Sequence, residues 1–453
     1  MAESNFSLQK TLTMLLDEKK YHSLRDILST MNPADIAAIF DDLDQARLPL
    51  LFRLLPKELA AETFVEMEPE AQELLIQGFS DSELKEVIDE LYVDDAVDIV
   101  EEMPANVVQR ILTQAEPDMR KQINEILRYP EDSAGSIMTT EYVSLRPNMT
   151  VEEAILRIRR TGIDKETIYT CYVMDEKRRL EGVVTVKDLL MNDYAALMGD
   201  IMDPHVIKAY TTEDQEKVVE TFNEYNLLSL PVVDGEDRLV GIITVDDVMD
   251  VMEQEATEDF EKMAAMLPSE KPYLKTGVFQ LARNRIPWLM ILMLSSMVTG
   301  GILLKYENAF SVIPLLVTFI PMLMDTGGNS GSQASTMIIR GMAVGEVEPA
   351  DILKVMWKEI RVGMLCGLSL ALVNFVRLMI QYPGQVLICL TVVISLFCTV
   401  IIAKTIGCVL PIAAKTIHLD PAIMASPMIT TIVDACSLMI YFQLACHLLN
   451  MKA

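Results

Sequence analysis

The segment Pro321–Arg340, "PMLMDTGGNSGSQASTMIIR", places three glycines and several polar side chains inside the most apolar part of the chain. In lipid, each unsatisfied backbone group costs several kcal/mol, so irregular backbone is tolerated only where it faces protein or a water-filled cavity. We therefore predict that this segment interrupts a helix and lines a pathway. The lining would consist of main-chain carbonyls exposed at Gly327 and Gly328 and of side-chain oxygens such as that of Asn329.

The last apolar run carries polar residues on one helical face. Ser426, Thr430 and Asp434 recur at every fourth position, which places them on the same side of a helix. An ionisable residue at membrane depth marks a functional site by default. One carboxylate with neutral oxygens, and without His or sulfur, suits a hard cation such as Mg²⁺ that keeps most of its waters. The alternative is a structural hydrogen bond from Asp434 to a neighbouring helix.

These residues lie in a half of the chain that is built from long apolar runs. Before residue 271 the chain has 58 acidic and 25 basic residues, and from residue 271 onward it has 8 and 13. Each apolar run is close to the roughly 20 residues that cross a bilayer as a helix. The five predicted spans are Ile286–Leu304, Asn308–Met324 with its continuation into the polar segment, Val362–Ile380, Pro383–Ala403 and Pro421–Cys446.

Basic residues predict how these spans are oriented. They fall before the first span, between the second and third, and between the fourth and fifth, and such loops stay in the cytoplasm. The acidic half is then cytoplasmic and the C-terminus lies outside. The first residues show no secretory pattern. We therefore expect a multi-pass protein of the plasma or inner cell membrane.

The acidic half begins with a repeat of 24 residues. Its units open at Met31, Leu55, Phe79 and Met103. Two short helices per unit, each burying one stripe against the next unit, would form a helical superhelix. The first helix of each unit is expected to start at Pro33, Pro56, Asp81 and Pro104.

A second repeat, between residues 173 and 249, has a more closely matching sequence. The stretches "VMDEKRRLEGVVTVKDLL" (173–190) and "VVDGEDRLVGIITVDDVM" (232–249) align without gaps, and each predicts a strand, a turn, a strand and a helix opened by Thr-Val-x-Asp. This resembles a tandem pair of CBS modules, which implies a regulatory unit that binds adenosine nucleotides or ions. Thr185 and Asp188 stand where the family contacts nucleotide. The alternative is that each Thr/Asp pair only caps its helix.

Acidic residues crowd the segment 246–261, which predicts one long helix leading into the linker before the first span. They are Asp246, Asp247, Asp250, Glu253, Glu255, Glu258, Asp259 and Glu261. Carboxylates one turn apart repel each other, so the run needs cations nearby. A solvated charged face is the alternative, but a second acidic set, Asp94, Asp95 and Asp98, favours a cation site shared between domains.

The stretches "GGNSGSQASTMIIRG" and "DPAIMASPMITTIVD", the tandem CBS pair and the acidic helical N-domain together resemble the MgtE family of magnesium channels. The resemblance implies a homodimer with a central pore, a plug helix between the CBS pair and the membrane, and closure by intracellular Mg²⁺. It also implies that Asp434 is the pore carboxylate. The sensor acids that it implies are Glu62, Asp94, Asp98, Asp214, Glu216, Asp247, Asp250, Glu255, Glu258 and Asp259. Asn226, where an acid is expected, and Asp325, an extra carboxylate, depart from the pattern.

The predicted fold class is multidomain, with α and α/β soluble parts and an all-α membrane part. The expected domains are a helical superhelix N-domain at 1–130, CBS modules of βαββα type at 131–198 and 199–255, a plug or connecting helix at 256–282, and five transmembrane helices within 283–453.

The leading hypothesis is a Mg²⁺-selective channel for magnesium uptake that intracellular Mg²⁺ closes. One alternative is a cation-coupled secondary carrier of Mg²⁺ or Co²⁺, and the other is a membrane-anchored CBS sensor of nucleotides or ions. The four histidines are scattered and no nucleophile pairs with a base, so no enzyme activity is expected. The expected partners are a second copy of the chain, membrane lipid and divalent cations, with ATP as a candidate ligand of the CBS pair and no nucleic acid.

Overall fold

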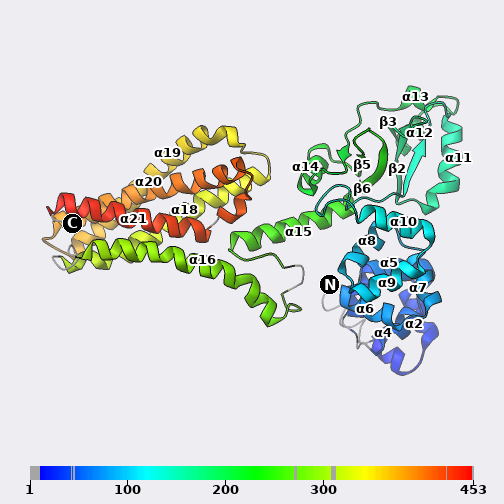
Figure 1. Cartoon of the computed structure of the whole chain (residues 1–453), viewed down its shortest axis with the longest axis horizontal. Helices are drawn as coiled ribbons and strands as arrows, with labels where there is room; N and C mark the ends of the chain where they lie inside the picture. Colours follow the sequence, from blue (N-terminus) through cyan, green and yellow to red (C-terminus); the bar gives the residue numbers. More distant parts are fainter. Residues whose placement is uncertain are drawn as a thin grey trace. The chain divides into compact units, whose positions relative to one another are not determined.

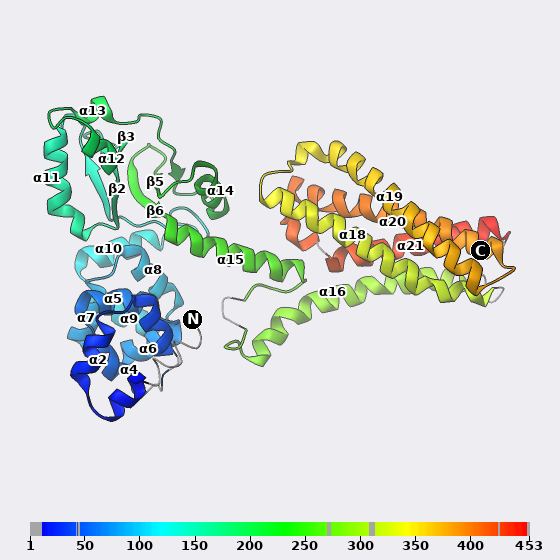
Figure 2. The ribbon, with the colours of Figure 1, turned by 180° about the vertical axis from the view of Figure 1, so that it is seen from behind.

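The computed structural model describes residues 11–41, 43, 46–269, 273–307, 313–424 and 426–450. The chain divides into two compact units, Met1–Met252 and Glu253–Ala453, and each is described here by itself. Figures 1 and 2 show the first unit as a stack of short helices next to two small sheets, and the second as a group of long helices.

The N-terminal superhelix is confirmed, with two helices in each repeat. The helices that open the units begin at the predicted prolines and aspartate or one residue later. At α7, Ser80 and Glu83 form a reciprocal capping box, in which the Ser80 amide donates to the Glu83 carboxylate at 2.8 Å. The helices are α2 (Tyr21–Leu28), α3 (Pro33–Asp41), α4 (Leu48–Phe52), α5 (Lys57–Val65), α6 (Pro69–Gly78), α7 (Asp81–Ile88), α8 (Val93–Glu102), α9 (Ala105–Gln114) and α10 (Pro117–Ile126).

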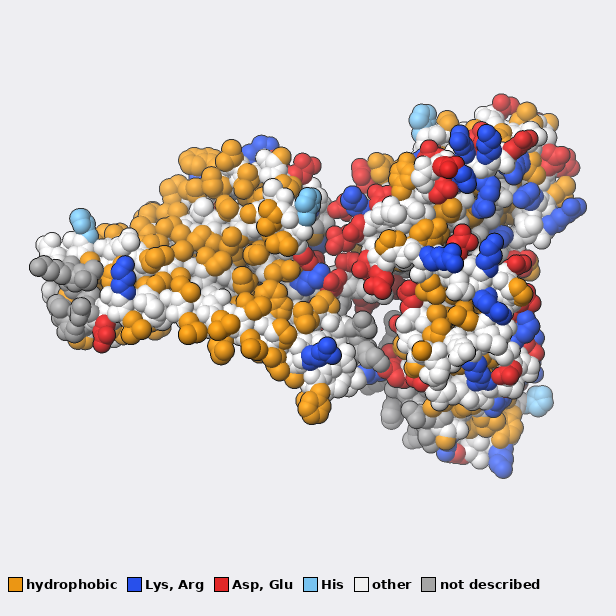
Figure 3. Space-filling view, in the orientation of Figure 1, with side chains coloured by type: hydrophobic (Ala, Val, Ile, Leu, Met, Phe, Trp, Pro, Cys, Tyr) orange, Lys and Arg blue, Asp and Glu red, His pale blue; other side chains and the backbone are white. Residues whose placement is uncertain are grey.

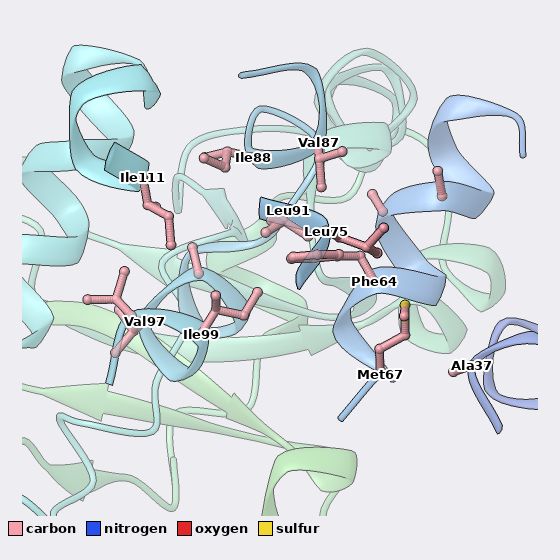
Figure 4. Packing of buried hydrophobic residues seen from close by; sticks show 14 of the residues in the cluster. Ala37, Phe64, Met67, Leu75, Val87, Ile88, Leu91, Val97, Ile99 and Ile111 are labelled. Atoms are coloured by element: carbon pink, nitrogen blue, oxygen red, sulfur yellow. The ribbon is translucent and has the colours of Figure 1, made fainter. Parts of the chain in front are cut away.

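The core of the superhelix is continuous from repeat to repeat. Phe64 of α5, Leu75 of α6 and Ile99 of α8 belong to this core and are labelled in Figure 4. The rings of Phe52 and Phe79, from the first and the third repeat unit, lie 5.4 Å apart between centroids. This core also includes residues of the second CBS module such as Leu230, so the superhelix and that module pack together inside the first unit.

The two sheets of the CBS pair repeat the same pattern. Each has a parallel pair followed by an antiparallel pair, in the orders β1-β2-β3 and β4-β5-β6. Gly182 and Gly241 hold equivalent positions, where a Cβ would come within 2.6 Å of the sulfur of Met202 or Met138. The elements are β1 (Tyr142–Leu145), α11 (Val151–Thr161), η1 (Gly162–Asp164), β2 (Thr167–Met174), β3 (Leu180–Thr185), α12 (Val186–Met191), α13 (Met198–Ile201), β4 (Ala209–Tyr210), α14 (Gln215–Tyr225), β5 (Ser229–Val233) and β6 (Leu239–Thr244).

The long acidic helix is confirmed as α15 (Val245–Met263), which follows β6 directly and runs through the predicted domain limit at 255. In the second unit, four helical segments of the described residues are long and apolar enough to cross a membrane. Figure 3 shows hydrophobic side chains over most of the visible face of this unit. Its elements are α16 (Val278–Lys305), η2 (Pro314–Phe319), α18 (Ile320–Ala343), η3 (Pro349–Asp351), α19 (Ile352–Gln381), α20 (Val386–Thr416), η4 (Pro421–Met424) and α21 (Ser426–Leu448).

The second predicted span differs from the structure. Residues 308–312 lie outside the described part, and a 3-10 helix, η2, precedes α18, which begins only at Ile320. Helix α18 then continues without interruption through the glycine-rich motif to Ala343. The predicted chain break is therefore wrong, because the helix itself satisfies the backbone groups that a break would expose.

The glycines of α18 instead allow close helix packing. A Cβ on Gly327 would lie 2.8 Å from the Thr399 methyl of α20, and one on Gly331 would lie 2.7 Å from Ile429 of α21. Small residues let helix backbones approach in this way, which replaces the hydrophobic driving force that lipid removes. The motif is thus a packing seam on one side of α18.

This seam predicts a strong effect at Gly407 of α20, where a Cβ would collide with the Gly331 carbonyl oxygen. Gly407→Val is expected to destabilise the membrane unit by about 1–3 kcal/mol, because the backbone of α18 must move. Thermal unfolding in detergent, followed by gel filtration, measures the loss. Gly301→Val is the matched control, since a Cβ at Gly301 of α16 meets nothing within 4 Å. Equal melting temperatures for both variants would contradict the packing seam.

Candidate cation sites

The polar residues of the membrane unit separate onto two sides of α18. Asp325 and Asn329, one turn apart, are exposed on the surface of the single chain, whereas Gly327 and Gly328 are buried. Asp434 of α21 is half-buried and lies within electrostatic range of Asp325. The structure therefore brings two carboxylates, from α18 and α21, toward one region of the membrane unit.

The other residues of the predicted lining have different surroundings. Thr430 donates its hydroxyl to the Pro427 carbonyl at 2.9 Å, and its methyl group faces Gly328. The side chain of Ser426 lies outside the described part of the structure. Within a single chain, Gly327, Gly328 and Thr430 thus make helix-to-helix contacts, and their place in a pathway stays a prediction.

In the first unit, acidic side chains gather where α8 meets the CBS pair. Asp94, Asp95 and Asp98 lie on α8, and Asp247 lies in the first turn of α15. Glu166, directly before β2, joins them, because the charges of Asp247 and Asp95 act on its carboxyl group. Figure 3 shows acidic side chains gathered over α14 and α15 of this unit.

These carboxyl groups are hard to ionise together. Burial, followed by the charge of Asp247, raises the pKa of Asp95 and Asp98 to about 7. The same two causes raise the pKa of Glu166 to about 8 and that of Asp94 well above its ordinary range. Burial, together with the charge of Asp246, raises the pKa of Asp247 itself to about 6. Near neutral pH the cluster therefore holds protons or attracts cations, and a divalent ion would replace the protons.

The carboxylates of this cluster do not form a complete coordination shell for a metal ion. Within the described ranges, no three His, Cys, Asp or Glu side chains converge closely enough to hold a metal ion. Mg²⁺ usually keeps several of its waters and contacts few carboxylates directly. Such an arrangement suits hydrated divalent cations bound by charge, with no position defined for each ion.

Three further predicted sensor residues lie on α5 and at the start of α14. Glu62 is exposed on α5, and Asp214 caps α14 by accepting a hydrogen bond from the Glu216 amide at 2.9 Å. Asn226 ends the same helix in a left-handed conformation, with φ at 51°. Asn tolerates this conformation better than most residues. The helix end therefore gives a structural reason for Asn at position 226, where the family resemblance led us to expect an acid.

The candidate nucleotide residues of the CBS pair are helix caps in this structure. Thr185 and Asp188 form a reciprocal capping box at the start of α12, in which the Thr185 amide donates to the Asp188 carboxylate at 2.9 Å. At the equivalent place before α15, the hydroxyl of Thr244 donates to the carboxylate of Asp247. The capping alternative accounts for these contacts, and nucleotide binding stays a prediction.

Asp250 lies on α15, and its charge helps to raise the pKa of Asp247. The other predicted acids, Glu255, Glu258 and Asp259, belong to the second unit. Glu258 pairs with Lys262 one turn further along α15. Burial, followed by the charge of Asp420, raises the pKa of Asp259. Asp420 lies directly before η4, so this acidic group involves both α15 and the connection that leads into α21.

The sequence reasoning missed Glu141, Glu166 and Asp420. The first two precede β1 and β2, and the Glu166 amide donates to the Glu141 carbonyl at 3.0 Å. Parallel strands that start together bring the residues before them to the same sheet edge, so the CBS alignment contained a signal for this pair. No local pattern marks Asp420, because its neighbours on α15 are distant in the sequence.

Comparisons with known proteins agree with this architecture. The family model "Divalent cation transporter" matches residues 320–444, the MgtE intracellular N domain matches 31–132, and the CBS domain matches 134–193 and 198–254. The chain is therefore a divalent cation transporter by class, a multi-pass membrane protein and not an enzyme.

Whole-length relatives narrow the class. The magnesium transporter MgtE of Thermus thermophilus is 38% identical over 98% of this chain and 99% of its own length. That of Bacillus subtilis is 31% identical over 96% of each. The crystal structure of the cytosolic domain of the Mg²⁺ channel MgtE in complex with ATP matches 54% of this chain and 99% of that one, with 40% identity and a TM-score of 0.51. The chain belongs to the MgtE family and transports Mg²⁺.

Proposed function

We propose that this transporter is a Mg²⁺-selective channel for uptake, which intracellular Mg²⁺ closes. The observation that carries the proposal is the buried acidic cluster between α8 and the start of α15, where burial and the charge of Asp247 raise the pKa of Asp95 and Asp98. Without cations these carboxylates repel, which loosens the superhelix from the CBS pair. Mg²⁺ favours the compact state, and α15 carries that change toward the membrane helices.

The conduction pathway belongs to the same proposal. We place it along the polar side of α18 and α21, where Asp434 supplies the carboxylate and Asp325 adds to its field. Because Asp325 and Asn329 are exposed on one chain, a second copy facing them would enclose the pathway. A homodimer with its acidic half in the cytoplasm and its C-terminus outside follows from this arrangement and from the basic loops.

Single-channel recording in liposomes tests the proposal. Discrete Mg²⁺ currents that stop when Mg²⁺ is raised on the side of the acidic half support a gated channel. Saturable flux without unitary currents would favour the cation-coupled carrier. ATP is a further candidate ligand, because the related cytosolic domain of the Mg²⁺ channel MgtE was crystallised in complex with ATP. Calorimetry of ATP with the Thr185→Ala variant tests that binding site.

The raised pKa values predict a pH dependence of the soluble unit. Protons bound by Asp95, Asp98 and Glu166 stabilise its compact state at low pH, and this stabilisation is lost as pH rises through about 6 to 8. Mg²⁺ competes with these protons, so it should protect α8 from hydrogen exchange far more at pH 8 than at pH 6. In Asp98→Asn the contrast between the two pH values should shrink. Equal protection by Mg²⁺ at both pH values would contradict the cluster's role.

A further inference from the structure

An ion pair joins the C-terminal end of α15 to the connection that precedes the last membrane helix, α21. The Nζ atom of Lys262 lies 2.7 Å from Oδ2 of Asp420, before η4, and it also contacts the carboxylate of Glu258. About a quarter of each side chain in the Lys262–Asp420 pair is exposed, so water screens the pair less than a fully exposed one. Figures 1 and 2 both draw this end of α15 next to the start of α21.

Both partners of this ion pair are held in place by other contacts. The Oδ1 atom of Asp420 accepts a hydrogen bond from the Ala422 amide at 2.8 Å, which leaves Oδ2 for Lys262. After α15 the chain turns back, and the Ser269 amide donates to Glu261 at 2.6 Å. The ion pair therefore joins two ordered elements at low entropic cost.

The chain after α15 is also tied to the first membrane helix. The Leu267 amide donates to the Asn284 carbonyl of α16 at 3.0 Å, and the Asn284 side chain donates to the Pro268 carbonyl at 3.2 Å. These neutral contacts fix the linker but do not reach the connection before α21. Lys262 of α15 reaches that connection through its ion pair with Asp420.

The charges around Lys262 show what the ammonium does. Glu258 and Asp259 on α15 and Asp420 before η4 are three carboxylates on two elements, and they repel across the gap between the elements. Lys262 is the cation in direct contact with two of them, while Arg340 of α18 acts on Asp259 from a greater distance. If Lys262 were neutral, the end of α15 would be driven away unless divalent ions took its place.

We propose that Lys262 is a positioning residue that holds the end of α15 against the membrane unit without any divalent ion. It gives the closed state a baseline stability, to which bound Mg²⁺ adds. This inference rests on the proposed closure through α15 and adds a part that Mg²⁺ does not supply. A channel built in this way needs less Mg²⁺ to close than its carboxylates alone would require.

Variants that remove or keep the charge of Lys262 test the ion pair in the full-length protein. In the absence of Mg²⁺, Lys262→Met and Asp420→Asn should each speed proteolytic cleavage of the linker at 264–269 about fivefold, as expected for a loss near 1 kcal/mol. Asp420→Asn retains an oxygen for the Ala422 amide, so it removes the charge and keeps the turn. Lys262→Arg keeps the positive charge beside Asp420 and Glu258, so its cleavage should stay slow. Lys354→Met is the matched control. It breaks an ion pair of the membrane unit in which Lys354 and its partner Asp351 are only three residues apart.

Mg²⁺ flux in liposomes provides the second readout. Lys262→Met should raise flux at low internal Mg²⁺ and increase the Mg²⁺ needed for closure, and Lys262→Arg should do neither. Unchanged cleavage in Lys262→Met, or cleavage as fast in Lys262→Arg as in Lys262→Met, overturns the inference. Closure of Lys262→Met at lower Mg²⁺ than wild type also overturns it, because the ammonium would then be a competitor of Mg²⁺. Faster cleavage in Lys262→Met but not in Lys262→Arg, with unaltered flux in both, supports the ion pair and instead counts against closure through α15.

Discussion

Replacing Asp434 by alanine is expected to reduce Mg²⁺ uptake to background while the protein still folds. The side chain is only half-buried on α21, so its removal costs little packing. What is lost is the carboxylate that concentrates cations in the proposed pathway. Asp434→Asn keeps the size and the polar oxygen but should lose most of the flux as well, because charge is the property that matters. Radioisotope-free uptake assays with a fluorescent Mg²⁺ indicator in liposomes measure both.

The neighbouring carboxylate gives this prediction a matched control. Asp325 acts on Asp434 from α18 and is exposed on the single chain. Asp325→Asn should lower the flux only severalfold, because Asp434 remains and its field is reduced but not removed. Wild-type uptake by Asp434→Asn would remove Asp434 from the pathway. Equal loss in both variants would mean that the two carboxylates act as one site.

The structure of the soluble half could be derived from the sequence because its repeats make each element visible more than once. A proline or an N-cap residue marks the start of α3, α5, α7 and α9, and the 59-residue offset places the Thr-Val-x-Asp stretch at two helix starts. Repeated local signals of this kind need no knowledge of the tertiary fold. The long acidic helix that became α15 was predicted differently, from the run of acidic residues at 246–261.

The membrane half shows where such reasoning stops. Glycine in "DTGGNSGSQ" is compatible with a chain break and with close helix packing, and the sequence alone does not distinguish them. The choice depends on whether neighbouring helices offer small surfaces, as Thr399 and Gly407 of α20 do. The acidic contacts are similar, because Glu166 and Asp420 acquire their partners through tertiary structure. The sequence therefore showed which polar residues are candidates for function. It did not show which side of the helix the glycines face, or which side chains the acidic residues contact.

The two acidic groups of α15 divide its length into regions with separate roles. Its first turn, with Asp247, faces the acids of α8, and its last turn, with Lys262, is tied to Asp420. Both turns belong to one helix of 19 residues. In the proposed closure, this helix carries a change in the charge balance at its first turn toward its last turn.

Mg²⁺-dependent closure is expected to weaken strongly when the first acidic group is reduced. Asp247→Asn combined with Asp250→Asn should raise the Mg²⁺ concentration needed for closure about tenfold. Asparagine can still accept the hydrogen bond from Thr244 that caps α15, so the helix start is retained. Shifting a two-state equilibrium from 1:99 to 99:1 takes about 5.5 kcal/mol of differential binding. Several weak sites, each contributing roughly 1–2 kcal/mol, can supply this, and the double variant removes a share of it.

The measurement compares closure with protection of the linker. In wild type, millimolar Mg²⁺ should slow proteolysis within 256–269, and in the double variant the same protection should need about tenfold more Mg²⁺. Glu153→Gln is the matched control. It also neutralises a carboxylate that caps a helix, at the start of α11 in the first CBS module. If the double variant closes at the wild-type concentration, or if the control shifts equally, the acids of α15 do not sense Mg²⁺. If protection shifts while flux does not, the cluster binds Mg²⁺ without controlling the pathway.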